Sequence, residues 1–253
     1  MTAKKSHSKK IRALPLNLMS WMAAVCFIAG LAVLAGFYLE QNTRINSVDF
    51  SGTYFTDTDD LAIAIETVSP VGELADSVNY ASIFEALRPL PYVKDIDVSM
   101  NFRGRLTFTI GEYEPIALIV DGTERMYVSD DGVLLPLVPG RAKDVPLVYG
   151  FRASAPGDSL SGAAWEEMEQ FLTEAKKSTV NWATLSELAW NETEGVVALS
   201  HENGVKLVFG REDFSERLAH WELFYTDVIR HEGIDKFRLI DLRFRNQIVT
   251  QQS

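Results

Sequence analysis

The chain has 253 residues, with 24 Lys and Arg against 35 Asp and Glu, which gives a formal net charge of −11. The first twelve residues hold five basic side chains and no acid, so the rest of the chain carries a net charge of −16. An acidic surface repels nucleic acid and anionic headgroups, and we expect neither as a partner. The single cysteine, Cys26, excludes a disulfide within the chain, so the fold must depend on its hydrophobic core.

An uncharged and largely apolar stretch covers residues 13–39. About 20 apolar residues suffice to cross the hydrocarbon core of a membrane, and residues 18–39 supply them. Because basic residues stay on the cytoplasmic side, we expect residues 1–12 to be a cytoplasmic tail, residues 13–39 a single transmembrane anchor, and the bulk of the chain to lie outside. A cleaved signal peptide fits less well, since its apolar region has only about 7–15 residues.

Residues 44–114 follow the order strand, helix, helix, strand, strand. Alternating apolar residues predict the strands, near residues 45–50, 93–100 and 106–110. Apolar residues three or four positions apart predict one helix that is capped by Thr56 or Asp57 and a second around residues 80–87. This pattern predicts a small domain with one sheet and two helices.

Residues 115–253 read mostly as short strands, with helices around residues 165–175 and 214–228. Asn203-Gly204 is a strong hairpin signal, and Asp213 with Glu216 resembles a capping box for the long helix. The last two strands are expected at residues 237–243 and 247–250. We therefore predict an α+β protein with one N-terminal transmembrane helix, a βααββ domain over residues 44–114, and a larger, mostly antiparallel β domain with flanking helices over residues 115–253.

Residue types that carry catalysis or bind metals form no recognisable motif. His201, His220 and His231 have no second His or Cys at the spacing of a metal site, and the chain has no Gly-x-Ser-x-Gly sequence. The acidic cluster at residues 57–60 lacks the glycine and the distal glutamate of a calcium loop, so helix capping explains it better. We expect no catalytic residue, no cofactor, no metal and no small-molecule substrate.

Two arginines, Arg211 and Arg243, lie beside expected strand ends in this acidic part of the chain. The simpler interpretation is that each pairs with a nearby acid of the same chain, and the sequence favours it. The alternative is that they receive a carboxylate from a partner, because the guanidinium fork suits that task.

Five segments resemble, in the same order, segments of the FtsQ/DivIB cell-division family. They are residues 45–52, 106–110 with 112–117, 127–134, 207–211 and 240–244. The first two resemble the first and last strands of a POTRA (polypeptide-transport-associated) domain. Residues 207–211 resemble the family's "L-x-L-G-R" strand, and residues 240–244 its terminal "V-D-L-R-Y" strand. Phe244 stands where the family commonly has Tyr, and residues 101–104 replace its usual Trp-Pro turn.

This resemblance implies a POTRA-like βααββ domain and a scaffold rather than an enzyme. Its implied place is the division septum, in the cell inner membrane, with a cytoplasmic N-terminus and a periplasmic bulk. The implied partners are FtsB-like and FtsL-like bitopic division proteins, with other divisome proteins as further candidates. The positions that match the family's partner surface are Arg211, Arg243, Phe244, Arg245, Asn246, Gln247, Ile248 and Val249. A last strand at a sheet edge suits such a role, because its unpaired main-chain groups can bind a partner strand.

Two other classes remain open. POTRA-like modules also occur in envelope chaperones and transport components, although those normally carry several modules in tandem before a barrel. A cell-wall enzyme is the other alternative, and the missing catalytic motif disfavours it.

Overall fold

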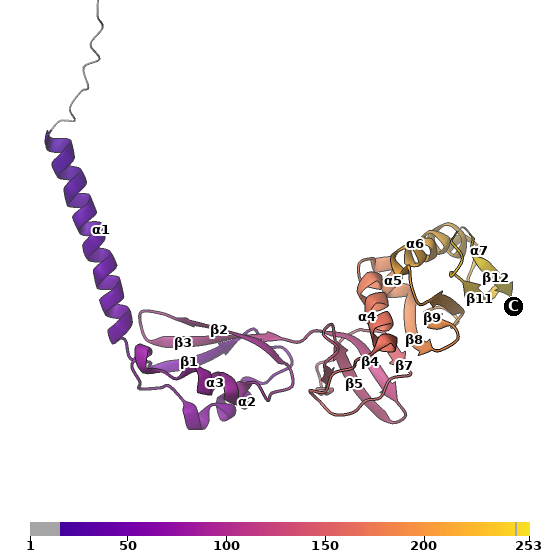
Figure 1. Ribbon diagram of the computed structural model, residues 1–253, viewed down its shortest axis with the longest axis horizontal. Helices are drawn as coiled ribbons and strands as arrows, with labels where there is room; N and C mark the ends of the chain where they lie inside the picture. The colour runs from indigo at the N-terminus through magenta and orange to yellow at the C-terminus, as the bar shows by residue number, and fades with distance from the viewer. Residues whose placement is uncertain (1–15, 246) are drawn as a thin grey trace, which may run out of the picture.

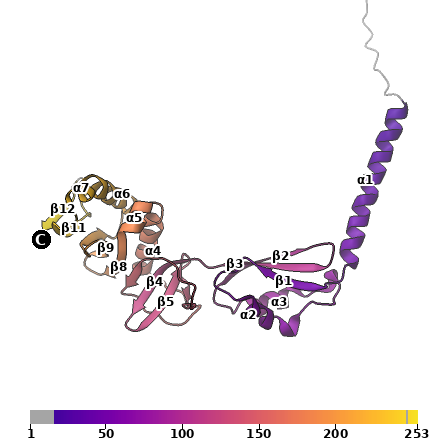
Figure 2. The same cartoon turned by 180° about the vertical axis from the view of Figure 1, so that it is seen from behind.

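The computed structural model describes residues 16–245 and 247–253, without the side chains of residues 16–19, 35 and 37–42. A long helix is followed by a three-stranded sheet and then by a nine-stranded sheet (Figure 1). Figure 2 shows from behind that the three parts follow one another along an extended molecule.

Helix α1 spans Leu16–Asn42 and stands away from both sheets (Figure 1). It confirms a helix over most of the predicted anchor, while residues 1–15 lie outside the described part. Large apolar side chains of α1 are well exposed, among them Trp21 at 73% and Phe27 at 69%. In the part of the chain that the structure describes, no helix is found that is long and apolar enough to cross a membrane.

The first sheet confirms the predicted order of strand, helix, helix, strand, strand. Its elements are β1 (Ser47–Ser51), α2 (Thr58–Ala64), the 3-10 turns η1 (Glu66–Val68) and η2 (Ala75–Ser77), α3 (Tyr80–Leu87), β2 (Val93–Met100) and β3 (Arg105–Glu112). Strand β3 lies in the middle, parallel to β1 and antiparallel to β2. The core beneath the helices is apolar and fully buried, and its members include Leu61, Ile83, Leu87, Leu106 and Phe108.

The second sheet contains the remaining strands, with its long helices packed against it. Its elements are β4 (Pro115–Asp121), β5 (Glu124–Ser129), β6 (Leu134–Leu135), β7 (Leu147–Tyr149), α4 (Ala163–Ala175), α5 (Thr179–Thr184), β8 (Leu185–Asn191), β9 (Gly195–Ser200), β10 (Lys206–Gly210), α6 (Phe214–Phe224), the π-helical turn η3 (Tyr225–Ile229), α7 (Arg230–Glu232), β11 (Phe237–Asp241) and β12 (Val249–Gln252). The strand order is β12-β11-β10-β9-β8-β7-β4-β5-β6. Phe171 of α4 packs on Phe209 of β10, with ring centroids 4.7 Å apart.

The expectation of a mostly antiparallel second sheet is confirmed in part, because the sheet is mixed: among the described residues, five of its eight strand pairs are antiparallel and three are parallel. The pairs β4–β7, β7–β8 and β10–β11 are parallel. Helices α4 and α5 connect β7 to β8, and α6 with η3 and α7 connects β10 to β11. A helical crossover returns the chain to the same end of the sheet, and the next strand then runs parallel to the previous one.

Local predictions in this half have mixed outcomes. The Asn203-Gly204 hairpin is confirmed, and both residues have φ 58°, as a tight hairpin turn requires. The capping box is wrong: Asp213 precedes α6 in a left-handed conformation, and its side chain makes no cap hydrogen bond. A capping side chain normally belongs to a residue with extended backbone, which Asp213 does not have. Asp57 likewise precedes α2 without a side-chain cap bond.

The two sheets share a third apolar cluster at their junction. Phe55 and Tyr92 come from the first sheet's part of the chain, and Tyr127 and Leu135 from the second. The rings of Phe55 and Tyr92 stack with centroids 4.3 Å apart, and the Tyr92 hydroxyl donates to the Pro136 carbonyl at 2.6 Å. The carboxylate of Glu112 accepts backbone N–H bonds from residues 54–56 at 2.7–2.8 Å, which fixes the loop that carries Phe55.

Candidate partner-binding edge

Strand β12 is an end strand of the nine-stranded sheet, as the sequence predicts for the last strand. It pairs antiparallel with β11, with Asp241 opposite Val249 and Ile240 opposite Thr250. The strand begins at Val249 rather than at residue 247, and β11 ends at Asp241 rather than at residue 243. Both predicted boundaries are therefore wrong by two residues, and residues 242–245 and 247–248 lie outside the strands, in the loop beside the edge.

Two glycines on neighbouring strands set the geometry around the predicted arginines. Gly195 and Gly210 both have positive φ, and they face each other at a bulge between β9 and β10. A Cβ on Gly195 would lie 2.4 Å from the backbone of Gly210, and a Cβ on Gly210 would lie 2.5 Å from the Arg217 guanidinium. This explains the Gly of the Gly210-Arg211 motif: the backbone and three arginines pass too closely here for any side chain.

Arg243 is held by Asp241, two residues earlier on the same face of the chain. Its Nε donates to Asp241 Oδ1 at 2.9 Å and its Nη2 donates to Oδ2 at 2.6 Å. Asp241 is only 7% exposed. Burial acts to raise the pKa of Asp241, but the hydrogen bonds and charge of Arg243 outweigh it, so the pKa lies below its ordinary value. Arg243 thus balances a buried carboxylate within its own chain.

Arg211 also has partners of its own. Its guanidinium lies over the Trp190 ring, 5.1 Å from the centroid, and 3.8 Å from the Glu167 carboxylate. It donates to the Glu192 carbonyl as well. Trp190 Nε1 donates to Glu167 at 2.6 Å, which fixes the acid that faces Arg211. The simpler interpretation from the sequence, pairing with a local acid, is therefore what the structure contains for both arginines.

The loop between β11 and β12 borders a groove of about 560 Å³ against α6 and η3, lined by apolar and polar side chains. Its walls are His220, Leu223, Phe224, Asp227 and Val228 on the helical side and Arg245, Gln247 and Ile248 on the loop side. Leu223 is 60% exposed, and Phe244, earlier in the loop, is 44% exposed. Exposed large apolar side chains beside an unpaired strand edge are features of a binding surface.

The predicted site residues differ in where their side chains lie. Arg211 and Arg243 lie against the glycine pair and are engaged within the chain. Phe244, Arg245 and Gln247 are exposed in the loop, Ile248 packs on the core, and exposed Val249 begins β12; Asn246 lies outside the described residues.

Sequence reasoning missed the residues that hold this surface together. Asp241 holds Arg243, Glu167 and Trp190 hold Arg211, and Arg217 fills the space beside Gly210. The Asp-x-Arg spacing of Asp241 and Arg243 was a usable signal, because residues two apart in an extended chain share a face.

Among the described residues, no group of three or more His, Cys, Asp or Glu side chains could hold a metal ion. The edge combines an end strand, an exposed aromatic ring and a groove lined by apolar and polar side chains.

Comparison with known proteins places this fold in a family. The model described as FtsQ/DivIB, C-terminal related, matches residues 114–251, more than half of the chain. The chain therefore belongs to the FtsQ/DivIB family. This membership indicates that it is a cell-division protein.

Several curated relatives match over most of their length. The cell division protein FtsQ of Rhodothermus marinus is 27% identical, over 99% of this chain and 92% of its own. The protein of the same name from Haemophilus influenzae is 25% identical, over 87% of this chain and 85% of its own. That of Escherichia coli is 25% identical, over 86% and 76%. The solved extracytoplasmic domain of DivIB from Geobacillus stearothermophilus is 20% identical, over 47% of this chain and 97% of its own, with a TM-score of 0.33.

Proposed function

We propose that this chain is a non-enzymatic scaffold of the bacterial division septum that binds bitopic partners of the FtsB or FtsL type at β12. The observation that carries the proposal is the end strand β12, flanked by the exposed ring of Phe244. A partner strand beside β12 gains main-chain hydrogen bonds, while Phe244 and the groove supply side-chain contacts. Family membership supports the same role.

The second part of the proposal is that α1 anchors the chain in the inner membrane with the N-terminus in the cytoplasm and the sheets in the periplasm. The exposed apolar side chains of α1 support it, because such a surface is unfavourable in water. The five basic residues among residues 1–12 support the direction. The POTRA-like identity of the first sheet belongs to this proposal and rests on the resemblance of its strands and their order.

Co-purification tests partner binding, and protease digestion of spheroplasts tests the membrane topology. The full chain is expressed with a tagged FtsB-type protein of the same organism, and the two are co-purified from detergent-solubilised membranes. We expect Phe244→Ala to weaken capture by about 2 kcal/mol, roughly thirtyfold, because aromatic anchors dominate interface energies. The thermal midpoint should change little, since Phe244 is 44% exposed. Protease added to spheroplasts should remove the sheets and release the partner.

Phe102→Ala is the matched control, because Phe102 is a phenylalanine that is 82% exposed in the turn between β2 and β3. It should leave capture unchanged. Equal capture by the Phe244→Ala and wild-type chains would place the partner site elsewhere. Sheets that resist protease in spheroplasts yet are digested in lysed cells would refute the topology.

A further inference from the structure

Two loops of the first sheet's part of the chain are tied to the residues that directly follow α1. Backbone hydrogen bonds of 2.7–3.0 Å join residues 43–46 to the loop 70–76 and to the turn 101–105 between β2 and β3. Helix α1 ends at Asn42, and one residue spans at most about 3.6 Å. Both loops therefore lie close to the end of α1, and Figures 1 and 2 show the turn between β2 and β3 beside it.

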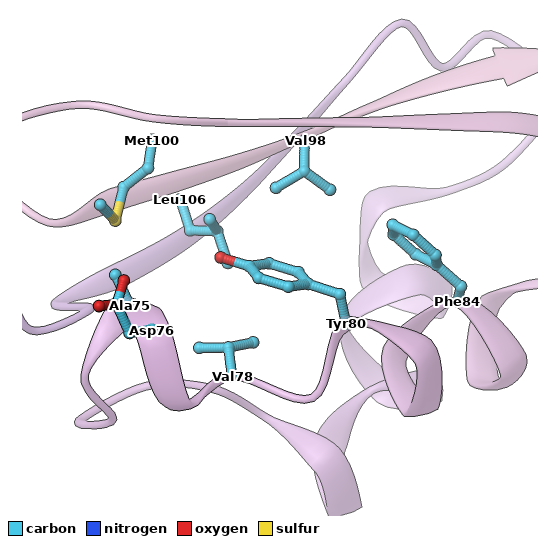
Figure 3. Close-up of a pocket in the computed structure, with 8 residues that line it drawn as sticks. All are labelled: Ala75, Asp76, Val78, Tyr80, Phe84, Val98, Met100 and Leu106. Carbon is cyan, nitrogen blue, oxygen red and sulfur yellow. The ribbon is translucent and has the colours of Figure 1, made fainter. Parts of the chain in front are cut away.

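The two loops also meet each other, at one end of a hollow of about 650 Å³ between β2 and η2. Figure 3 shows Met100, the last residue of β2, at the same end of this hollow as Ala75 and Asp76 of η2. Phe102 follows Met100 by two residues, and Leu74 comes directly before Ala75. Both loops therefore belong to one end of the first sheet, which we call the α1-side end.

Large apolar side chains are exposed at the α1-side end. Phe102 is 82% exposed, and Val71 and Leu74 are exposed in the other loop. The apolar side chains of α1, such as Trp21 and Phe27, are exposed in the same way. Exposed apolar residues at the end of an apolar helix extend the surface of that helix, so the same surroundings should cover both.

Basic side chains accompany these apolar ones, although the chain as a whole has a net charge of −11. Arg103 lies over the Phe102 ring, 5.4 Å from its centroid. Arg44 donates through Nη1 to a backbone carbonyl of the neighbouring loop at 2.9 Å, which uses one of the five N–H donors of its guanidinium. Arg105, by contrast, pairs with Asp49 at 3.2 Å. Arg44 and Arg103 therefore have donors left for the phosphates of lipid headgroups, while their stems cover apolar surface.

We propose that the α1-side end lies in the interface of the bilayer that holds α1, with the Phe102 ring among the upper acyl chains and Arg44 and Arg103 at lipid phosphates. The inference rests on the proposed anchoring of α1 and adds a second membrane contact, which restricts rotation of the first sheet about the end of the helix. Glu73 and Asp76 lie at the same end, so we expect the phosphates of zwitterionic lipid to suffice. The contact needs a bilayer, and Phe102→Ala therefore stays a control for measurements made in detergent.

The test uses the full chain, labelled with 4-fluorophenylalanine, in phosphatidylcholine nanodiscs. The fluorine signals of Phe102 and Phe244 are assigned by their loss in the Phe102→Leu and Phe244→Leu chains. A lipid with a nitroxide near the top of its acyl chain should broaden the Phe102 signal and leave that of Phe244 sharp. A water-soluble gadolinium chelate should do the opposite, although Phe102 is the more exposed ring on the protein, at 82% against 44%.

The double variant Arg44→Glu with Arg103→Glu should open the ring to the chelate, because carboxylates then face the lipid phosphates in place of guanidinium groups. The Phe108 ring is buried in the core of the first sheet, and an unshifted Phe108 signal shows that the variant is folded. The matched control is Arg88→Glu with Arg125→Glu, which makes the same change of charge at exposed positions outside the α1-side end. The control should leave the ring protected from the chelate.

The outcomes separate this inference from the anchoring of α1. A chain that does not co-elute with the nanodiscs would overturn both. Co-elution with a wild-type Phe102 ring that the chelate reaches as readily as Phe244 would overturn the membrane contact of the sheet alone. Protection of Phe102 from both agents would mean that a protein surface covers it, such as a second copy of this chain, and would overturn the inference as well.

Discussion

Strands β2 and β12 are end strands of their sheets, but the charges beside them differ in kind. Beside β2, the carboxylates of Asp76, Asp95 and Asp97 form no ion pair and no side-chain hydrogen bond among the described residues, although Asp95 interacts electrostatically with Lys94. Beside β12, Arg211 and Arg243 are each held by an acid of their own chain. A free charge can contribute directly to binding, whereas an engaged charge must first give up its internal bonds.

Because of this contrast, different groups are exposed for contact with a partner at the two edges. At β12 the groups available without rearrangement are the main chain, Phe244 and the groove with its exposed Arg245. Apolar contact and this one arginine should therefore decide what binds there. At β2 the exposed face of the strand carries the carboxylates of Asp95 and Asp97 instead. The arginines at β12 act first on stability, because Arg243 offsets the buried charge of Asp241.

The largest expected effect tests whether the two edges belong to one cooperative body. Phe55→Ala removes a ring that is 6% exposed and stacks on Tyr92 at the junction. We expect a loss of about 3 kcal/mol of unfolding free energy and a split of one unfolding transition into two, because the shared cluster is opened. Calorimetry of the full chain in detergent measures both. Phe102→Ala, which truncates an exposed ring, should change neither; equal effects of the two variants would mean that the junction does not couple the sheets.

The sequence determines the elements well and the contacts between them poorly. Alternation and turn residues located the strands of both sheets, since the side-chain period of a strand is local information. The parallel pairing of β10 with β11 was missed, because it depends on how α6 packs. The candidate edge itself followed from the family resemblance, and engagement of Arg211 within the chain was the favoured interpretation, but its partners Trp190 and Glu167 were not predicted, since they lie far from it in sequence. Asp213 was misjudged because its backbone is left-handed, whereas a capping residue normally has extended backbone.

A smaller effect separates the two kinds of charge directly. Arg243→Glu should lower the free energy of unfolding by about 2 kcal/mol, because it leaves the buried Asp241 carboxylate facing a second negative charge. Water screens part of this repulsion, since the side chain at position 243 is partly exposed. Asp97→Lys on β2 should stay within about 0.5 kcal/mol of the wild type, as surface substitutions without a partner do. Urea unfolding of the full chain in detergent compares the two. A larger loss for Asp97→Lys than for Arg243→Glu would reverse the comparison.

The smallest effect is a pH dependence that belongs to the β12 edge. The pKa of Asp241 lies below its ordinary value, and Lys206, with further help from Arg243, lowers the pKa of Glu194 as well. A carboxyl group whose pKa is lower in the folded than in the unfolded chain stabilises the fold above its unfolded pKa of about 4, and this stabilisation is lost as the pH falls through the folded pKa. Arg243→Gln removes the main partner of Asp241. The difference in unfolding free energy between wild type and Arg243→Gln should therefore be largest near pH 7 and shrink toward pH 3.

The matched control is Lys177→Gln, because Lys177 pairs with Glu174 on the surface and is 63% exposed. An exposed pair of this kind contributes little, so the control should unfold like the wild type at every pH. If the Arg243→Gln difference instead stays constant down to pH 3, Arg243 stabilises the edge through packing of its stem rather than through its charge. The arginine would then be free to meet a partner's acid without cost to Asp241, and the contrast between the two edges would no longer hold.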